Sequence, residues 1–109
     1  MREDELAGGL PGAIAVVEEE GTPVLRLTGE IDSEVVAAYD DSGRRPGPSA
    51  AVIDASAVTF LDARGLRFLV GQSRAARGAG RSLVLRRPAR IVARVIDLAG
   101  VRACFTIAL

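Results

Sequence analysis

The side chains in this sequence that could do chemistry are three aspartates, Asp32, Asp54 and Asp62, each at or near the end of an apolar run. The 109 residues include no histidine and one cysteine, Cys104. This composition excludes a Cys/His zinc site, a Ser-His-Asp triad, a Cys-His nucleophile pair and an internal disulfide. The carboxylates could cluster for acid–base catalysis, but no nucleophile accompanies them. We therefore expect no enzyme, no cofactor and no metal site.

Asp62 stands where a helix is expected to begin, ahead of Ala63, Arg64 and Gly65. An aspartate in this position caps a helix, because its carboxylate accepts a hydrogen bond from a free amide of the first turn. Binding sites of open α/β sheets gather at such strand-to-helix turns. One interpretation is an ordinary helix cap. The other is a docking turn, at which Gly65 exposes the backbone to another surface.

The elements that would position this turn alternate along the chain. Apolar alternation or apolar runs predict strands over residues 13–18, 24–28, 50–55, 82–85 and 104–109, with a further short apolar segment at 58–61. Turn residues at 21–23 join the first two strands into a hairpin. Helices are expected after residue 31, with Asp32 or Ser33 as the N-cap, over residues 63–77, and from Pro88 in a first turn to Gly100 as the C-cap.

The resulting order is ββαβαβαβ. It predicts an α/β fold with a mixed five-stranded sheet and helices mainly on one side. By length the chain holds one domain, over residues 13–109, after a flexible segment at 1–12. Residues 42–48 are expected to form a loop. No apolar run is long enough for a membrane helix and the start is unlike a signal peptide, so we expect no membrane insertion and a cytoplasmic location.

Charge is divided unevenly between the two halves of the chain. Residues 1–54 carry 12 acids and 4 arginines, a net of −8, and residues 55–109 carry 2 acids and 10 arginines, a net of +8. The halves could attract each other inside the fold, or the basic half could present a face to a partner. Aromatic residues are few and no nucleic-acid motif is visible, so nucleic acid is not the expected partner.

Four stretches, taken together and in order, resemble the STAS domain family, found in bacterial anti-sigma factor antagonists and in the cytoplasmic tails of sulfate transporters. They read LTGEID (27–32), VIDASAVTFLD (52–62), GL (65–66) and LAGV (98–101). The resemblance covers residues 13–109. It implies a STAS-like fold in which Asp32 and Asp62 end adjacent parallel strands. It also implies a non-enzymatic regulatory module that binds a protein partner.

The resemblance also implies a switch that this chain lacks. In phosphorylatable family members, a serine directly after the aspartate is modified by an anti-sigma factor that is also a serine kinase. Here that position is Ala63, followed by Arg64. We therefore expect docking on an anti-sigma factor of the histidine-kinase-like ATPase type, without phosphorylation at the usual site. The expected partner-binding residues are Asp32, Asp62, Ala63, Arg64, Gly65, Phe68, Gly71 and Ala75.

The last three of these residues come from the helical period of residues 63–77. Phe68, Gly71 and Ala75 fall on a strip away from the expected core centre, and this strip either receives a partner helix or packs on a neighbouring helix of the same domain. The arginines of this helix are expected to form a solvated flank. Arg64, which opposes the helix dipole, would pair with Asp62, Asp32 or a partner carboxylate.

Three alternatives stay open at this point. The chain could be a STAS scaffold subunit of a sensor assembly or of a transporter. It could be a nucleotide- or anion-binding STAS module that uses the helix tip. An enzyme built on the three aspartates is the third. Cys104 is expected to be a small buried hydrophobe in the last strand.

Overall fold

The protein is described by a computed structural model that covers residues 11–43 and 51–109. Most of the segment expected at 1–12 and most of the loop expected at 42–48 lie outside the described residues. The elements follow the order β1 (Ala13–Glu19), β2 (Thr22–Ile31), α2 (Ser33–Ser42), β3 (Val52–Leu61), α3 (Ala63–Gly78), β4 (Val84–Arg86), α4 (Arg90–Ala99), the 3-10 turn η1 (Arg102–Cys104) and β5 (Thr106–Ala108). The predicted order of strands and helices is confirmed.

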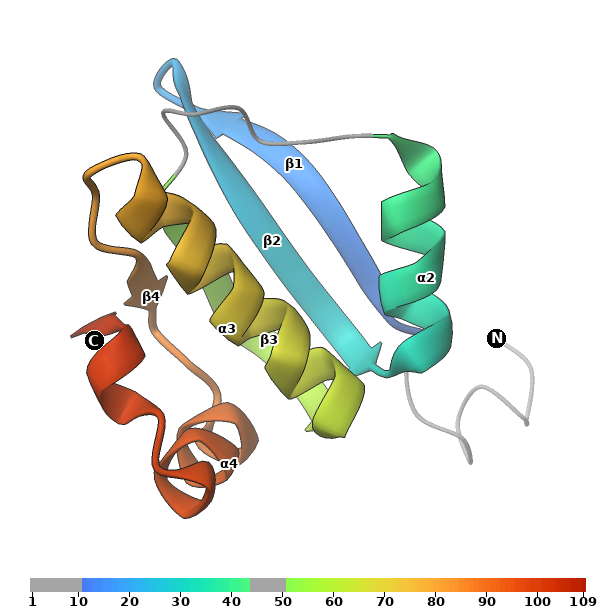
Figure 1. Ribbon diagram of the computed structural model, residues 1–109. Coiled ribbons are helices and arrows are strands. Elements are labelled where there is room, and N and C mark those ends of the chain that lie inside the picture. The colour runs from blue at the N-terminus through green and yellow to red at the C-terminus, as the bar shows by residue number, and fades with distance from the viewer. Residues whose placement is uncertain (1–10, 44–50) are drawn as a thin grey trace.

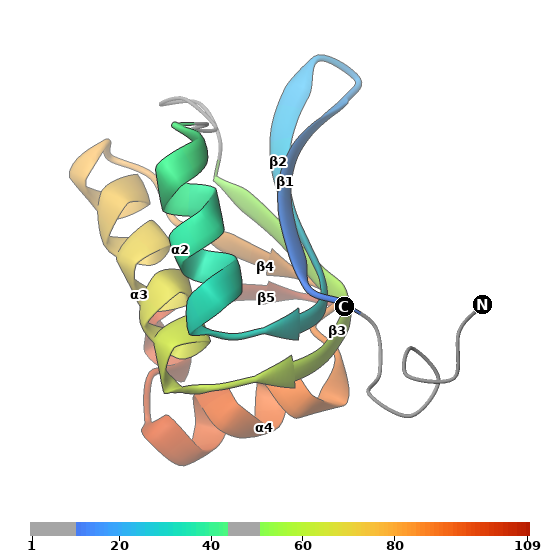
Figure 2. The same cartoon turned by 90° about the vertical axis from the view of Figure 1, so that its right-hand side faces the viewer.

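The five strands form one mixed sheet in the order β1-β2-β3-β4-β5. β1 is antiparallel to β2, and every later neighbour pair is parallel. Helices α2 and α3 lie side by side over one face of the sheet (Figures 1 and 2). α4 contacts β3, and the residue just before this helix is tied to β3 by the hydrogen bond from Ala89 N to Ala55 O. The predicted fold class is confirmed.

The core lies between this sheet and the two helices. Leu27 of β2, Ile53 of β3, Leu85 of β4 and Leu69 of α3 are completely buried. Parallel strands covered by helices are apolar in sequence, which explains why the run at 50–55 signalled a strand. At about 25 cal/mol per Å² of buried apolar surface, these side chains supply much of the drive to fold.

The hairpin turn differs from the predicted one by one residue. Its two central residues are Glu20 and Gly21, with φ of 53° and 80°, the positive values that a type I′ turn requires. Thr22 and Pro23, expected in the turn, begin β2 instead. Proline is tolerated there because β2 pairs with β3 only from Leu25 onward, so no neighbour needs the missing N–H.

β3 is one strand of ten residues where the sequence predicted two separate pieces. Its pairing with β2 shifts register between Arg26 and Thr28 and again between Gly29 and Glu30. Each shift leaves an extra residue on β3, which is a β-bulge. Bulges interrupt the alternation of side chains between the two faces of a sheet. The sequence in the middle of β3 therefore does not alternate between apolar and polar residues.

The last part of the chain also differs from prediction. Cys104 ends the 3-10 turn and is half-buried against the core, so its expected place in a strand is wrong. Its carbonyl accepts a hydrogen bond from Ser73 Oγ of α3. Pro88 lies ahead of α4 rather than in its first turn, whereas Gly100 is the C-cap, with φ of 72°.

Asp54 belongs to an ion-pair network on the sheet. Arg86 of β4 donates to Glu19 of β1 at 2.7 and 2.8 Å and to Asp54 at 3.1 Å, and Arg26 also donates to Glu19. Burial disfavours the charge of Asp54, but hydrogen bonds from Ser56 and Arg86 outweigh it, so the pKa of Asp54 is lowered. The pKa of Glu19 is lowered chiefly by its hydrogen bond from Arg86. Asp54 is thus a paired structural group.

Candidate functional site

Two aspartates end neighbouring parallel strands at the same edge of the sheet. Ile31 of β2 is the register partner of Leu61 of β3. One residue further on, the amide of Asp62 donates to the carbonyl of Ile31 at 3.3 Å. Asp32 therefore lies beside the turn that begins at Asp62, as predicted. Asp54 lies toward the other end of β3, so the three aspartates do not form the cluster that an enzyme would need.

Each of these two aspartates caps a helix. Asp32 Oδ1 accepts from the amide of Val35 at 3.1 Å, and Asp62 Oδ1 accepts from the amide of Gly65 at 2.8 Å. Both aspartates have the extended backbone of an N-cap and are half-buried. The two capping carboxylates satisfy otherwise free amides and face the positive ends of α2 and α3. The predicted caps are confirmed, and they leave two helix tips side by side.

The first two residues of α3 are Ala63, with a methyl side chain, and Arg64, with a positive charge. Ala63 is the first residue of the helix and is exposed, as is Arg64 after it. Arg64 makes no ion pair with any residue in the described part of the chain, so the predicted pairing with Asp62 or Asp32 is absent there. A cation in the first turn opposes the helix dipole. Arg64 is therefore an exposed cation at the helix tip without an acidic partner among the described residues.

Gly65 corrects one sequence expectation. It is buried, and a Cβ built on it would lie 2.6 Å from Ile31 O and 2.6 Å from Leu61 Cδ1. The close approach that this glycine permits is therefore to the end of β2 in its own chain. The backbone at Gly65 is buried, and the missing side chain lets α3 sit against the strand ends.

Phe68 corrects a second expectation. Its exposed fraction is 8%, and its ring packs edge-on against Tyr39 of α2, with centroids 5.4 Å apart. Of the two alternatives for this strip, packing on a neighbouring helix of the same domain holds for Phe68, because α2 lies beside α3 (Figure 1) and its Tyr39 contacts the Phe68 ring. Phe68 is a core residue and has no surface to offer a partner.

The other side of that strip is exposed. Gly71 and Ala75 are both accessible, and a Cβ on Gly71 would meet nothing within 4 Å. With them lie the four exposed arginines of α3: Arg64, Arg67, Arg74 and Arg77. None of the four has an ion-pair partner within residues 11–43 and 51–109. We call this surface, residues 63, 64, 67, 71, 74 and 75, the basic strip.

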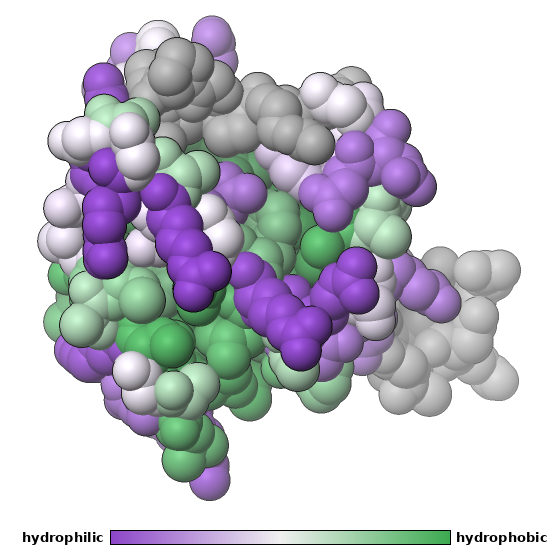
Figure 3. All heavy atoms as spheres, viewed as in Figure 1, coloured by the Kyte–Doolittle hydropathy of each residue, from purple (hydrophilic) through white to green (hydrophobic). Residues whose placement is uncertain are grey.

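An apolar groove of about 470 Å³ runs beside the basic strip. Leu66, Val70 and Val101 line its floor, and Arg67, Gly71 and Arg74 form its rim on α3. Figure 3 shows hydrophilic side chains in a row over α3 and apolar atoms beside them toward α4. Sequence reasoning missed this groove. Leu66 and Val70 signal an apolar flank by their spacing, but the position of Val101 depends on how the chain returns after α4.

The described residues hold no group of three or more His, Cys, Asp or Glu side chains that could bind a metal ion. Among the same residues, no helix has the length and apolar character needed to cross a membrane. What the site presents is two capped helix tips, unpaired arginines and an apolar groove. These features suit contact with another macromolecule better than chemistry on a small molecule.

The comparisons with known proteins agree with this architecture. The family model described as "Mlab, STAS domain" matches residues 14–107, and the chain therefore belongs to the STAS domain family. It resembles the anti-sigma-F factor antagonist RsfB from two strains of Mycobacterium tuberculosis, CDC 1551 / Oshkosh and ATCC 25618 / H37Rv. Each is 35% identical over 88 residues, with 72% of both chains covered.

A solved structure shows the same fold. The anti-sigma factor antagonist SpoIIAA in its unphosphorylated form superimposes with a TM-score of 0.63, covering 91% of this chain and 89% of that one. The identity is 20%, so this likeness concerns the fold alone. The chain is an anti-sigma factor antagonist-like STAS protein in sequence and in fold.

Proposed function

We propose that this protein is a non-enzymatic regulatory module that binds an anti-sigma factor through the tip of α3 and the basic strip. The observation that carries the proposal is the unpaired, exposed basic strip that continues from two adjacent aspartate-capped helix ends. The identity to proteins named as anti-sigma-F factor antagonists supports the choice of partner. No cofactor is required for this function.

The chemistry of the surface defines the partner more closely. Four arginines on α3 without acidic neighbours on that helix favour an acidic partner surface. The apolar floor of the groove favours one or two large apolar side chains between the acids. We propose that the partner is an anti-sigma factor of the histidine-kinase-like ATPase type, with a surface of this composition. Asp32 and Asp62 hold the two helix tips in register, and Gly65 and Phe68 support them from within.

The proposed regulation differs from that of phosphorylatable family members. Ala63 occupies the first position of α3 and has no oxygen to accept a phosphoryl group. Binding of this protein would then be independent of phosphate transfer to that position. Control would come from the amount of protein or from another site.

The first test is charge reversal on the basic strip. The double variant Arg67→Glu/Arg74→Glu is expected to lower affinity for the anti-sigma factor by about a hundredfold, because each lost rim contact costs about 1–2 kcal/mol. Isothermal titration against the purified anti-sigma factor captured by the wild type measures this loss. Arg90→Glu, an exposed arginine at the start of α4, is the matched control and should bind normally. Equal affinity for all three proteins would refute docking at the basic strip.

The second test restores a hydroxyl at the helix tip. Wild type should accept no phosphate there from a partner kinase, and Ala63→Ser should be a poor substrate because Arg64 crowds the approach and neutralises part of the charge. Ala63→Ser/Arg64→Ser should be phosphorylated better, and its phosphorylated form should bind more weakly than its unphosphorylated form, as the added charge of about −1.5 to −2 meets Asp32 and Asp62. Labelled-phosphate transfer followed by titration measures both effects.

The wild type supplies the control for this second test. Its exposed hydroxyls include Ser33 at the tip of α2, and Ser56 and Thr59 on β3. Phosphate on one of them, with loss of binding, would show that the switch operates from another residue and would contradict constitutive binding. Capture of a membrane transporter or a sensor assembly in place of an anti-sigma factor would favour the scaffold alternative.

A further inference from the structure

A second surface lies along β1, which is an edge strand of the sheet. β1 pairs with β2 on one side, and no other strand among the described residues pairs with its second side. The closing pair of the two-residue hairpin, Glu19 and Thr22, exchanges hydrogen bonds, so alternate residues from Glu19 backward bond to β2. The residues between them, Ile14, Val16 and Glu18, therefore point their amides and carbonyls away from the sheet.

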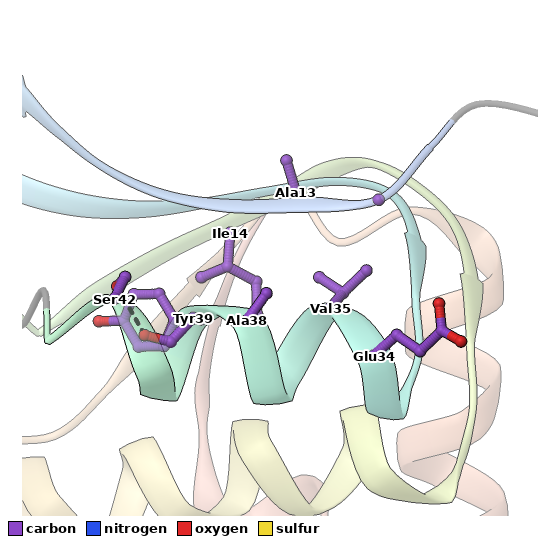
Figure 4. Close-up of a pocket in the computed structure, with 8 residues that line it drawn as sticks. Ala13, Ile14, Glu34, Val35, Ala38, Tyr39 and Ser42 are labelled. Atoms are coloured by element: carbon purple, nitrogen blue, oxygen red, sulfur yellow. Dashed lines mark hydrogen bonds between the residues drawn. The ribbon is translucent and has the colours of Figure 1, made fainter.

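Beneath this free edge is a groove of about 540 Å³ between β1 and α2. Figure 4 shows the side chain of Ile14 pointing from β1 toward α2, and Val35 and Ala38 facing it from the helix. Ala13 points to the other side of the strand. A strand added along β1 would lie over the mouth of this groove. Every second side chain of that strand would then enter the groove, because side chains alternate between the faces of a sheet.

The two elements that form this groove carry only acidic charges, and Glu34 lines the groove itself. Neither β1 nor α2 contains a basic residue. The exposed acids on these elements and on the hairpin turn are Glu18, Glu20, Glu34, Asp40 and Asp41. None of these five has an ion-pair partner in the part of the chain that the structure describes. A long, apolar free edge is a template for another strand, and here the acids determine which strand it accepts.

We propose that the edge of β1 and the groove beneath it bind an extended segment of a partner protein in which apolar residues alternate with arginine or lysine. The segment adds to the sheet beside β1 through backbone hydrogen bonds to Ile14, Val16 and Glu18. Its apolar side chains enter the groove and its cations meet the acids of α2 and of the hairpin. A second copy of this chain fits poorly, because pairing two β1 edges would bring the acidic rims of both copies together.

This surface is separate from the basic strip, which lies on the exposed face of α3. The two surfaces have opposite charge and different geometry, one a helix flank and the other a sheet edge. A partner held at β1 would therefore leave the basic strip accessible. The protein would then connect two partners.

The probe for the test is a short capped peptide of alternating arginine and valine. It is expected to bind the whole chain at low salt, measured by fluorescence anisotropy, and to bind more weakly as salt rises. Hydrogen exchange followed by NMR should show new protection of the amides of Ile14, Val16 and Glu18, while those of Ala15 and Val17 are protected in the free protein as well. A peptide with glutamate in place of arginine should not bind.

Val16→Pro removes an outward N–H without removing a hydrogen bond to β2. The variant should bind the peptide about tenfold more weakly, because one lost hydrogen bond costs about 1.4 kcal/mol. Val16→Thr keeps the N–H and is the matched control. Glu34→Gln should reduce affinity by about threefold and flatten the salt dependence, whereas Asp97→Asn on α4 should change neither. Glu34→Gln keeps the test valid if Val16→Pro does not fold.

Three results would overturn the proposal. Equal binding of the arginine and glutamate peptides would show that the acids do not select the segment by its charge. Protection of none of the three outward amides in the bound state would exclude strand addition. A dimer of the chain in sedimentation experiments, formed through protected β1 amides, would assign the edge to a second copy.

Discussion

Gly65→Ala is expected to destabilise the protein by about 2–3 kcal/mol, the range for overpacking a site that cannot relax. The added methyl group would lie 2.6 Å from a backbone oxygen, Ile31 O, and from Leu61 Cδ1. To accept it, the first turn of α3 must move away from the end of β2. That movement would disturb the amide of Gly65, which donates to Asp62, and therefore the cap as well. The measurement is the free energy of unfolding from urea denaturation.

Gly71→Ala on the same helix is the matched control for this prediction. Nothing lies within 4 Å of the Cβ that it adds, and the residue is exposed. Alanine in place of glycine in a helix interior should stabilise the protein by about 0.5–1 kcal/mol. The same substitution is thus expected to have opposite signs six residues apart. A neutral Gly65→Ala would show that α3 has room to shift and that the contact with β2 is not tight.

Phe68→Ala has the largest expected effect, a loss of about 3–5 kcal/mol of stability, as for other buried phenylalanines. The substitution removes the ring that packs edge-on against Tyr39 and opens a cavity between α2 and α3. For a domain of this size, each kcal/mol lowers the melting temperature by roughly 4–8 °C. Thermal unfolding followed by circular dichroism should therefore show a large decrease.

Phe60→Ala tests whether burial is the cause. Phe60 lies on β3 and is 47% exposed, so its removal should cost much less than that of Phe68. Similar losses for the two variants would contradict the assignment of Phe68 to the core. Because Phe68→Ala is expected to unfold much of the protein at moderate temperature, weaker partner binding by that variant would not identify a contact. Arg67 and Arg74 are the better probes of docking.

The acidic and basic halves of the sequence pair with each other only in part of the structure. Arg86, from the basic half, does pair with Glu19 and Asp54 of the acidic half, as internal attraction predicts. The arginines of α3 instead remain without described partners on one surface. The exposed acids of α2, β1 and the hairpin turn also lack described ion-pair partners. Attraction between the halves therefore accounts for the sheet network, and the remaining charges define two surfaces of opposite sign.

Local patterns were sufficient to predict much of this protein. The alternation of strands and helices, the caps at Asp32 and Asp62 and the C-cap at Gly100 depend on residues that are close in sequence. Such signals act through neighbouring backbone groups, so they survive whatever the rest of the chain does. The proximity of Asp32 to Asp62 was implied by the family resemblance, since both follow strands that it placed side by side. The family comparison supports the same fold independently.

The sequence by itself thus determined the order of strands and helices, the caps at Asp62 and Gly100, and the absence of histidine and disulfide chemistry. Only the tertiary structure decided which flank of α3 is covered. A helical period shows that Phe68 and Gly71 lie on neighbouring parts of one helix, but not that α2 packs over the first and leaves the second open. Gly65 looked like an opening for a partner because its neighbour in space, the end of β2, is thirty-four residues away in sequence. Burial depends on such distant contacts, and no local pattern encodes them.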